Sequence, residues 1–120
     1  MGGEISWRVG LRVKPGQLGN FRTLTGEMVA VTRREPGVLS YQRFVSEDGK
    51  IIHVYERYAD SAAAIAHLEA FAKRFASRFS ALVERKAFTV FGYPSAELKA
   101  VLDRFNTTYL KPFGDFDYWA

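Results

Sequence analysis

The stretch "VLSYQRFVSEDGKIIHVYERY", residues 38–58, predicts two β-strands, 38–45 and 50–58, joined by a tight turn. Asp48-Gly49 favours a two-residue hairpin turn, in which both central residues have a positive φ. Such a turn pairs Glu47 with Lys50 and sets the register of the hairpin. Because alternate residues of a strand point to opposite faces, one face carries Leu39, Tyr41, Val45, Ile52, Val54, Glu56 and Tyr58, and the other carries Gln42, Phe44, Ile51, His53 and Tyr55.

On both sides of the hairpin, the spacing of apolar residues predicts further strands and helices. Residues 5–13 alternate between apolar and polar side chains, as a half-buried strand does. Residues 17–34 place apolar side chains at steps of three and four, which indicates a helix. The remaining expected elements are a helix from Asp60 or Ser61 to about residue 84, a strand over residues 86–93 and a short helix from residue 95.

The resulting order, β-α-β-β-α-β, predicts an α+β, ferredoxin-like antiparallel sheet with helices on one face and an extra C-terminal helix. A chain of 120 residues suits a single domain. We expect its core at about residues 5–93, with the C-terminal helix and tail over residues 95–120. The closing "GDFDYWA", residues 114–120, has three alternative roles: covering a cavity, clasping a partner, or fraying.

Composition excludes several classes of function. The chain has no cysteine, which excludes disulfides, thiolate metal sites and cysteine nucleophiles and fits a reducing, cytoplasmic location. The sequence contains no run of 18 apolar residues, so it predicts no membrane-spanning helix. The net charge of +4 comes from scattered residues, so we expect no nucleic-acid partner. Both faces of the hairpin are too apolar to be left in water, which predicts a homodimer that stacks two sheets.

Four segments in order, "EPGVLSYQRF", "DGKIIHVYERYAD", "AIAHL" and "FGYPSAELKAVL", resemble the antibiotic biosynthesis monooxygenase family. The resemblance covers roughly residues 5–113. It implies a dimeric α+β barrel with a cavity between the helices and the sheet of each subunit. It also implies oxidation of small phenolic, quinol or anthrone-like aromatics by molecular oxygen without a cofactor. The family includes haem-degrading relatives and members with no demonstrated activity.

His67 is the first candidate for a catalytic base in such chemistry. It lies about 100° from the middle of the apolar stripe of its helix, so it can reach a cavity mouth. The alternative is a partly exposed helix histidine. The resemblance adds weight, since many members have a histidine here and a second one about five residues on. This chain has Ala72 at that second position.

The resemblance also suggests which hairpin residues line the cavity. By analogy, the aromatic of the pair Tyr55-Glu56 points into the cavity and donates a hydrogen bond to the substrate. That orientation places His53, a further catalytic candidate, and the substrate-binding candidates Gln42 and Phe44 on the same wall; all four could instead be packing residues. It places Tyr41 and Glu56 at the dimer interface. Trp7 is either cavity wall, contacting substrate, or core.

The leading functional hypothesis is therefore a cofactor-free monooxygenase acting on a small aromatic ligand. The alternatives are a non-catalytic small-ligand-binding or stress-associated dimeric barrel, and a pure interaction module. Haem-degrading relatives need an asparagine on the first strand and a tryptophan at the position of Tyr55, and this chain has neither. Two histidines on different elements match no standard ligand spacing, so we expect no metal.

Overall fold

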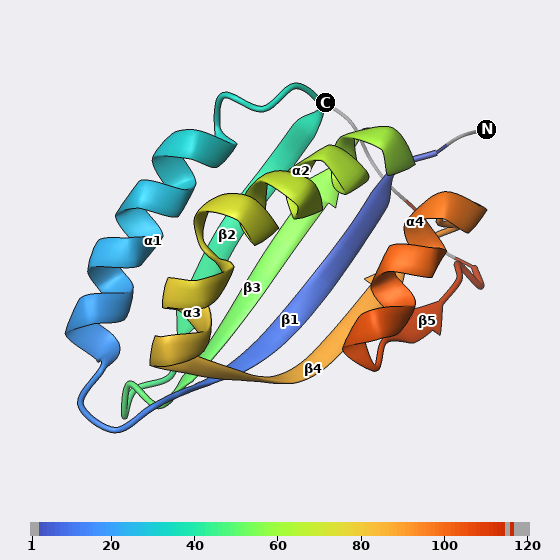
Figure 1. The fold of residues 1–120 in the computed structure, drawn as a ribbon. Coiled ribbons are helices and arrows are strands. Elements are labelled where there is room, and N and C mark those ends of the chain that lie inside the picture. Colours follow the sequence, from blue (N-terminus) through green and yellow to red (C-terminus); the bar gives the residue numbers. More distant parts are fainter. Residues whose placement is uncertain (1–2, 115, 117–120) are drawn as a thin grey trace.

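The strands of the computed structural model, which describes residues 3–114 and 116, form one sheet in the order β2-β3-β1-β4-β5. The helices lie on one face of this sheet (Figure 1). The predicted ferredoxin-like α+β fold is confirmed. The sheet is mixed, because β5 runs parallel to β4. The elements are β1 (Ile5–Val13), α1 (Leu18–Thr32), β2 (Val38–Val45), β3 (Ile51–Tyr58), α2 (Ser61–Arg74), α3 (Ala76–Leu82), β4 (Val83–Phe91), α4 (Ala96–Leu102), the 3-10 turn η1 (Asp103–Phe105) and β5 (Thr108–Leu110).

The sheet has a helix face, which the helices cover, and an open face, which they leave uncovered. The alternation predicted for residues 5–13 is confirmed in β1, whose apolar side chains are buried on the helix face. Cross-strand partners point to the same side, so the pairing of Trp7 with Glu56 puts Glu56 on the helix face as well. The core on this face includes Ile5, Trp7, Val9, Leu11 and Val13 of β1, Ile52, Val54 and Tyr58 of β3, and Phe88 and Val90 of β4.

The hairpin has the predicted register from Ser40 to Val45, but a register shift at Leu39 pairs Val38 with Tyr58, where Leu39 was expected. The turn also differs. Tyr41 pairs with Glu56 and Phe44 with His53, as expected. The Ser46 amide donates to the Ile51 carbonyl at 2.9 Å, so the loop is longer than two residues, and Gly49 is its one residue with a positive φ, at 73°. Hydrogen bonds from the Lys50 amide and the Ser46 hydroxyl hold the pKa of the Asp48 carboxyl below its usual value and stabilise this loop.

The helices follow the predicted pattern except at one break. The first, α1, is confirmed and buries Phe21, Leu24 and Met28. The Asp60 carboxylate caps α2 by accepting a hydrogen bond from the Ala63 amide at 2.9 Å. The single helix expected up to residue 84 is wrong, because the backbone leaves helical geometry at Phe75. The break gives α3 its own direction, and Phe79 meets Phe21 of α1 edge-on at 5.9 Å.

The C-terminal segment adds an element that the sequence did not predict. Ser95 caps α4, and its hydroxyl accepts from the Leu98 amide at 3.1 Å. Asn106, with a φ of 55°, then reverses the chain so that Thr108–Leu110 pairs with the edge of β4. Much of the tail "GDFDYWA", namely residues 115 and 117–120, lies outside the described residues. No helix in the described part of the chain is long and apolar enough to cross a bilayer.

Candidate active site

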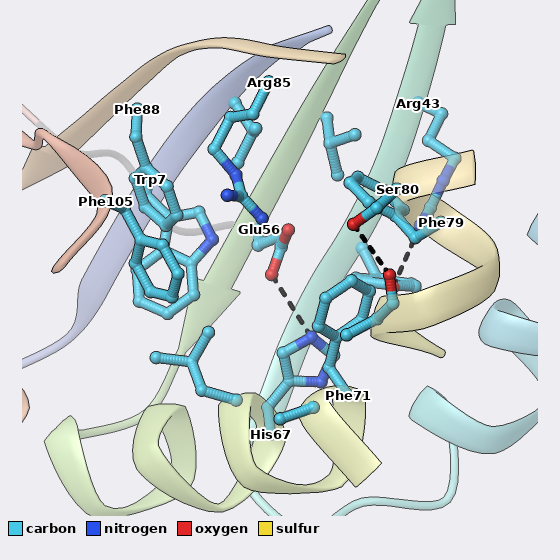
Figure 2. Close-up of a pocket in the computed structure, with 16 residues that line it drawn as sticks. Trp7, Arg43, Glu56, His67, Phe71, Phe79, Ser80, Arg85, Phe88 and Phe105 are labelled. Carbon is cyan, nitrogen blue, oxygen red and sulfur yellow. Dashed lines mark hydrogen bonds and ion pairs between the residues drawn. The ribbon is translucent and has the colours of Figure 1, made fainter. Parts of the chain in front are cut away.

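A cavity of about 270 Å³ lies between the helix face of the sheet and the helices. Its wall is mostly apolar and includes aromatic side chains from strands, helices and η1 (Figure 2). Phe88 and Phe105 stack with ring centroids 5.6 Å apart and planes 9° apart. Flat apolar walls of this kind suit a small aromatic ligand. The apolar lining residues are Trp7, Val9, Val54, Leu68, Phe71, Ala72, Ala76, Phe79, Phe88 and Phe105.

His67 lines this cavity and stands between two carboxylates. Its Nδ1 lies 2.8 Å from Oε1 of Glu35. On the cavity side, its Nε2 lies 3.5 Å from Oε1 of Glu56 (Figure 2). His67 is only 4% exposed and Glu56 only 7%. Glu35, in the loop after α1, also borders a surface groove with Arg34 and Arg74. The three side chains thus form a line from the cavity towards the surface.

Two tyrosines complete this polar cluster. The Tyr58 hydroxyl donates to the Glu56 carboxylate, and the Tyr41 ring lies edge-on to the His67 imidazole at 5.3 Å. Burial, followed by the charge of Glu56, raises the pKa of Tyr58 well above its usual value. Burial likewise raises the pKa of Tyr41. Both hydroxyls therefore stay protonated at neutral pH.

Two guanidinium groups line the same cavity on the helix face, one from β2 and one from β4 (Figure 2). Arg43 of β2 donates from Nη2 to the Tyr41 hydroxyl at 2.9 Å. Arg85 of β4 lies 4.8 Å above the Phe105 ring and points towards Glu56. Burial lowers the pKa of Arg85, and the charge of Glu56 opposes this shift. Arginine nevertheless remains charged in proteins, so the cavity holds two fixed positive charges.

The residues expected in the site fall into two groups. His67 and Trp7 line the cavity, as the sequence suggested. Four others, Gln42, Phe44, His53 and Tyr55, lie on the open face around a shallow hollow, so their expected place in the cavity was wrong. Tyr41 and Glu56 were expected at a dimer interface and instead line the cavity beneath the helices.

The physical reason for this exchange is the pairing of β3 with β1. Val54 pairs with Val9 and Glu56 with Trp7, so the even-numbered residues of β3 share the buried face of β1. The hairpin pattern alone leaves both faces apolar and does not choose between them. The apolar face of residues 5–13 is the signal that identifies the buried face of β3, because paired strands share a face and β1 pairs with β3.

Sequence reasoning missed Glu35, Arg43 and Arg85. Glu35 approaches His67 only because the α1–β2 loop and α2 pack together, a contact between residues 32 positions apart. Arg43 shares its hairpin face with Tyr41. The orientation of the Arg85 side chain depends on a register shift between β1 and β4. Leu11 pairs with Arg85, but the neighbouring Gly10 pairs with Ala87, so one residue of β4 is left between these pairs. This bulge changes the phase of alternation, so Arg85 and Phe88 both reach the cavity.

The arrangement of these side chains is suited to proton transfer. A buried carboxylate hydrogen-bonded to tyrosine and next to an imidazole can accept a proton from a ligand, and the imidazole can share it with Glu35. Nearby guanidinium groups stabilise negative charge that develops on the ligand. Within residues 3–114 and 116, no group of three or more histidine, aspartate or glutamate side chains is arranged to hold a metal ion.

Fold and site together describe a small ferredoxin-like α+β protein with a partly open cavity, lined in part by aromatic side chains, and a buried histidine beside a buried glutamate. The sequence profile of the antibiotic biosynthesis monooxygenase family matches residues 8–85, and the chain belongs to this family. No match was found among curated proteins.

Several solved structures share the fold. MupZ from Pseudomonas fluorescens is similar with a TM-score of 0.87 at 19% identity, covering 97% of this chain and 95% of that one. Protein SO0527 from Shewanella oneidensis is similar with a TM-score of 0.62 at 26% identity, covering 75% and 88%. SnoaB from Streptomyces nogalater, a cofactor-independent oxygenase, is similar with a TM-score of 0.66 at 18% identity, covering 78% and 96%.

Proposed function

We propose that this protein is a monooxygenase that oxidises a small phenolic, quinol or anthrone-like aromatic with molecular oxygen and without a cofactor. The observation that carries the proposal is the placement of His67 between Glu35 and Glu56 at an aromatic cavity. Membership of a monooxygenase family supports the reaction class. The description of SnoaB as a cofactor-independent oxygenase supports the absence of a cofactor.

In the proposed reaction, the protein prepares the substrate and oxygen supplies the oxidant. Glu56, coupled to His67, removes a proton from the phenol or from the methylene of an anthrone. The resulting anion gives electrons to molecular oxygen, and one oxygen atom becomes bonded to carbon. For an anthrone, the carbon loses both hydrogens and becomes a carbonyl, while the second oxygen atom leaves as water. Substrate and oxygen thus yield a quinone and water, with no other reductant.

The other side chains of the site have supporting roles in this proposal. Arg85 stabilises the substrate anion, because a guanidinium in a dry cavity interacts strongly with developing negative charge. The Tyr58 hydroxyl holds the Glu56 carboxylate in place. Trp7 contributes a wall on which the substrate ring packs, and Glu35 orients the imidazole of His67 through Nδ1.

Oxygen uptake tests the proposal. The wild-type protein is incubated with a panel of quinols and anthrones in an oxygen electrode, beside His67→Ala and a His53→Ala control. His53 is the matched control because it is the second histidine of the chain and lies on the open face. We expect uptake in the wild type and the control, and its loss in His67→Ala. If no substrate gives uptake that depends on His67, the proposal is wrong, and tight binding without uptake would indicate a ligand-binding protein.

We also propose that a second copy of the chain covers the open face. Phe44 is 58% exposed there, and Ile51 is also exposed, which leaves apolar surface in water in a single chain. Stacking two sheets face to face would bury this surface around the hollow that contains His53 and Tyr55. Light scattering at micromolar concentration measures the mass. A particle of 13.6 kDa, the mass of one chain, would contradict the homodimer.

A further inference from the structure

The positive charges that line the cavity are not fully balanced. The charged side chains of the lining are Arg43, Arg85 and Glu56, with His67 beside them. Glu56 acts on Arg85, whose guanidinium points towards it (Figure 2). Glu35 lies behind His67 and bonds to its far nitrogen. Among residues 3–114 and 116, no ion pair within 4.0 Å includes Arg43.

The guanidinium of Arg43 also has unused hydrogen-bonding capacity. Its Nη2 donates to the Tyr41 hydroxyl and lies 3.9 Å from the sulfur of Met28. Its Nε and Nη1 are buried and have no hydrogen-bond partner in the described part of the chain. Buried polar groups in folded proteins are nearly always hydrogen-bonded, and an unpaired buried charge is costly. Two nitrogens of a guanidinium that lines the cavity thus lack an acceptor, although the group also lies 4.2 Å from the centroid of the Tyr41 ring. A ligand with an acceptor group would supply the missing hydrogen bonds.

We propose that the ligand of this cavity is a small aromatic acid whose carboxylate accepts hydrogen bonds from Arg43. The inference rests on the proposed function and narrows its substrate class. The reacting phenol or enol would lie at Glu56 and His67, and the carboxylate would lie towards β2. The planar carboxylate matches the planar guanidinium. A neutral ligand of the same shape would close the cavity over an unpaired charge and would bind more weakly for that reason.

Matched ligand pairs test this inference without turnover. Benzoate, 1-naphthoate and 2-naphthoate are each compared with the corresponding carboxamide, which has the same shape and no charge. Calorimetric titration at pH 7 gives the dissociation constants for the wild type, Arg43→Met, Arg43→Lys and Arg8→Met. Arg8 lies on the open face, so its replacement removes the same charge outside the cavity. Thermal unfolding establishes that each variant is folded, and Arg43→Lys retains the charge if Arg43→Met does not fold.

We expect the wild type to bind at least one carboxylate about tenfold more tightly than its carboxamide, as charge-assisted hydrogen bonds predict. Arg43→Met should lose this preference, Arg43→Lys should keep part of it, and Arg8→Met should keep it in full. A wild type without carboxylate preference across the panel overturns the inference, as does an equal loss in Arg8→Met. Both of these results concern ligand binding only, so oxygen uptake with neutral quinols remains a separate test of the proposed function. If the protein prefers the carboxylates but consumes no oxygen with any substrate, the proposed monooxygenase function is wrong and the inference about the ligand stands.

Discussion

The helix face and the open face of the sheet carry similar side chains in different surroundings. On the helix face, Glu56 and Tyr58 are buried and meet His67 of α2. On the open face, His53 and Tyr55 border a shallow hollow that the helices of the described residues leave uncovered. Both pairs combine an ionisable group with a tyrosine on the same strand. Only the first pair is removed from water and connected to further ionisable groups, and this difference makes it the candidate for acid–base chemistry.

The largest expected effect comes from removing the carboxylate on the helix face. Glu56→Gln should lower kcat for oxygen uptake by about 10²–10⁴-fold, the usual contribution of a general base. Tyr55→Phe, on the open face, should leave kcat within about twofold, since it removes no buried charge. Steady-state rates on the first substrate that supports uptake compare the two variants. A similar loss in both would mean that the open face takes part in the reaction.

The two faces should also differ in their contribution to stability. Trp7 is 1% exposed and packs against Tyr58 and Phe88, so Trp7→Ala should lower the free energy of unfolding by about 3–5 kcal/mol. Phe44→Ala should change the stability of a single chain by only about 0.5 kcal/mol. Urea denaturation at several protein concentrations measures both. An effect of Phe44→Ala that grows with protein concentration would support a second copy on the open face.

A smaller effect is expected behind the cavity, at Glu35. Glu35→Gln keeps an acceptor for His67 Nδ1 but removes the negative charge, which should lower kcat about tenfold, the equivalent of about 1.4 kcal/mol in the activation free energy. The fold should be unaffected, as circular dichroism would establish. Glu47→Gln, in the exposed hairpin loop, is the matched control and should retain wild-type kcat. Equal rates in wild type and Glu35→Gln would show that the Glu35 charge has no role in the reaction.

The smallest effect should appear as a dependence of stability on alkaline pH. The pKa of Tyr58 is higher in the folded state than in the unfolded chain, where it is about 10, so the folded state holds more protons between these two values. The stabilisation is present in full below about pH 10 and is lost as the pH rises above it. Denaturation at pH 8, 9.5 and 10.5 would measure the slope. Tyr58→Phe should reduce this slope, and an unchanged slope would assign it to other groups.

Local pattern predicted the elements of this fold well. Strict alternation identified β1, and the hairpin register was correct from Ser40 to Val45 although the turn was longer than expected and the pairing shifts at Leu39. The register survived because shortening or lengthening the loop evenly on both sides leaves the same residues opposite each other. Periodicity failed where a local irregularity intervened, at the break of the helix at Phe75 and at the bulge before Ala87 in β4. β5 is only three residues long and has no pattern to detect.

The site was harder to predict, because its residues come together from distant positions. The sequence singled out His67 as a base, and the structure buries it beside the cavity. Its partners are Glu35, which lies in a loop, and Glu56, which lies in a strand. The sequence spacing between His67 and either glutamate matches no motif. The analogy that turned Tyr55 towards the cavity chose the wrong face of β3.

By itself, the sequence determined the order of the elements, the pairing within the hairpin and the absence of cysteine chemistry. These features depend on neighbouring residues and on alternation, which are local properties of the chain. Only the tertiary structure decided which face of β3 is covered by helices, because β1 pairs with β3 across some forty residues and both faces of the hairpin are apolar. That one non-local choice moved Glu56 and Tyr41 from an expected interface into the cavity, and His53 and Tyr55 out of it.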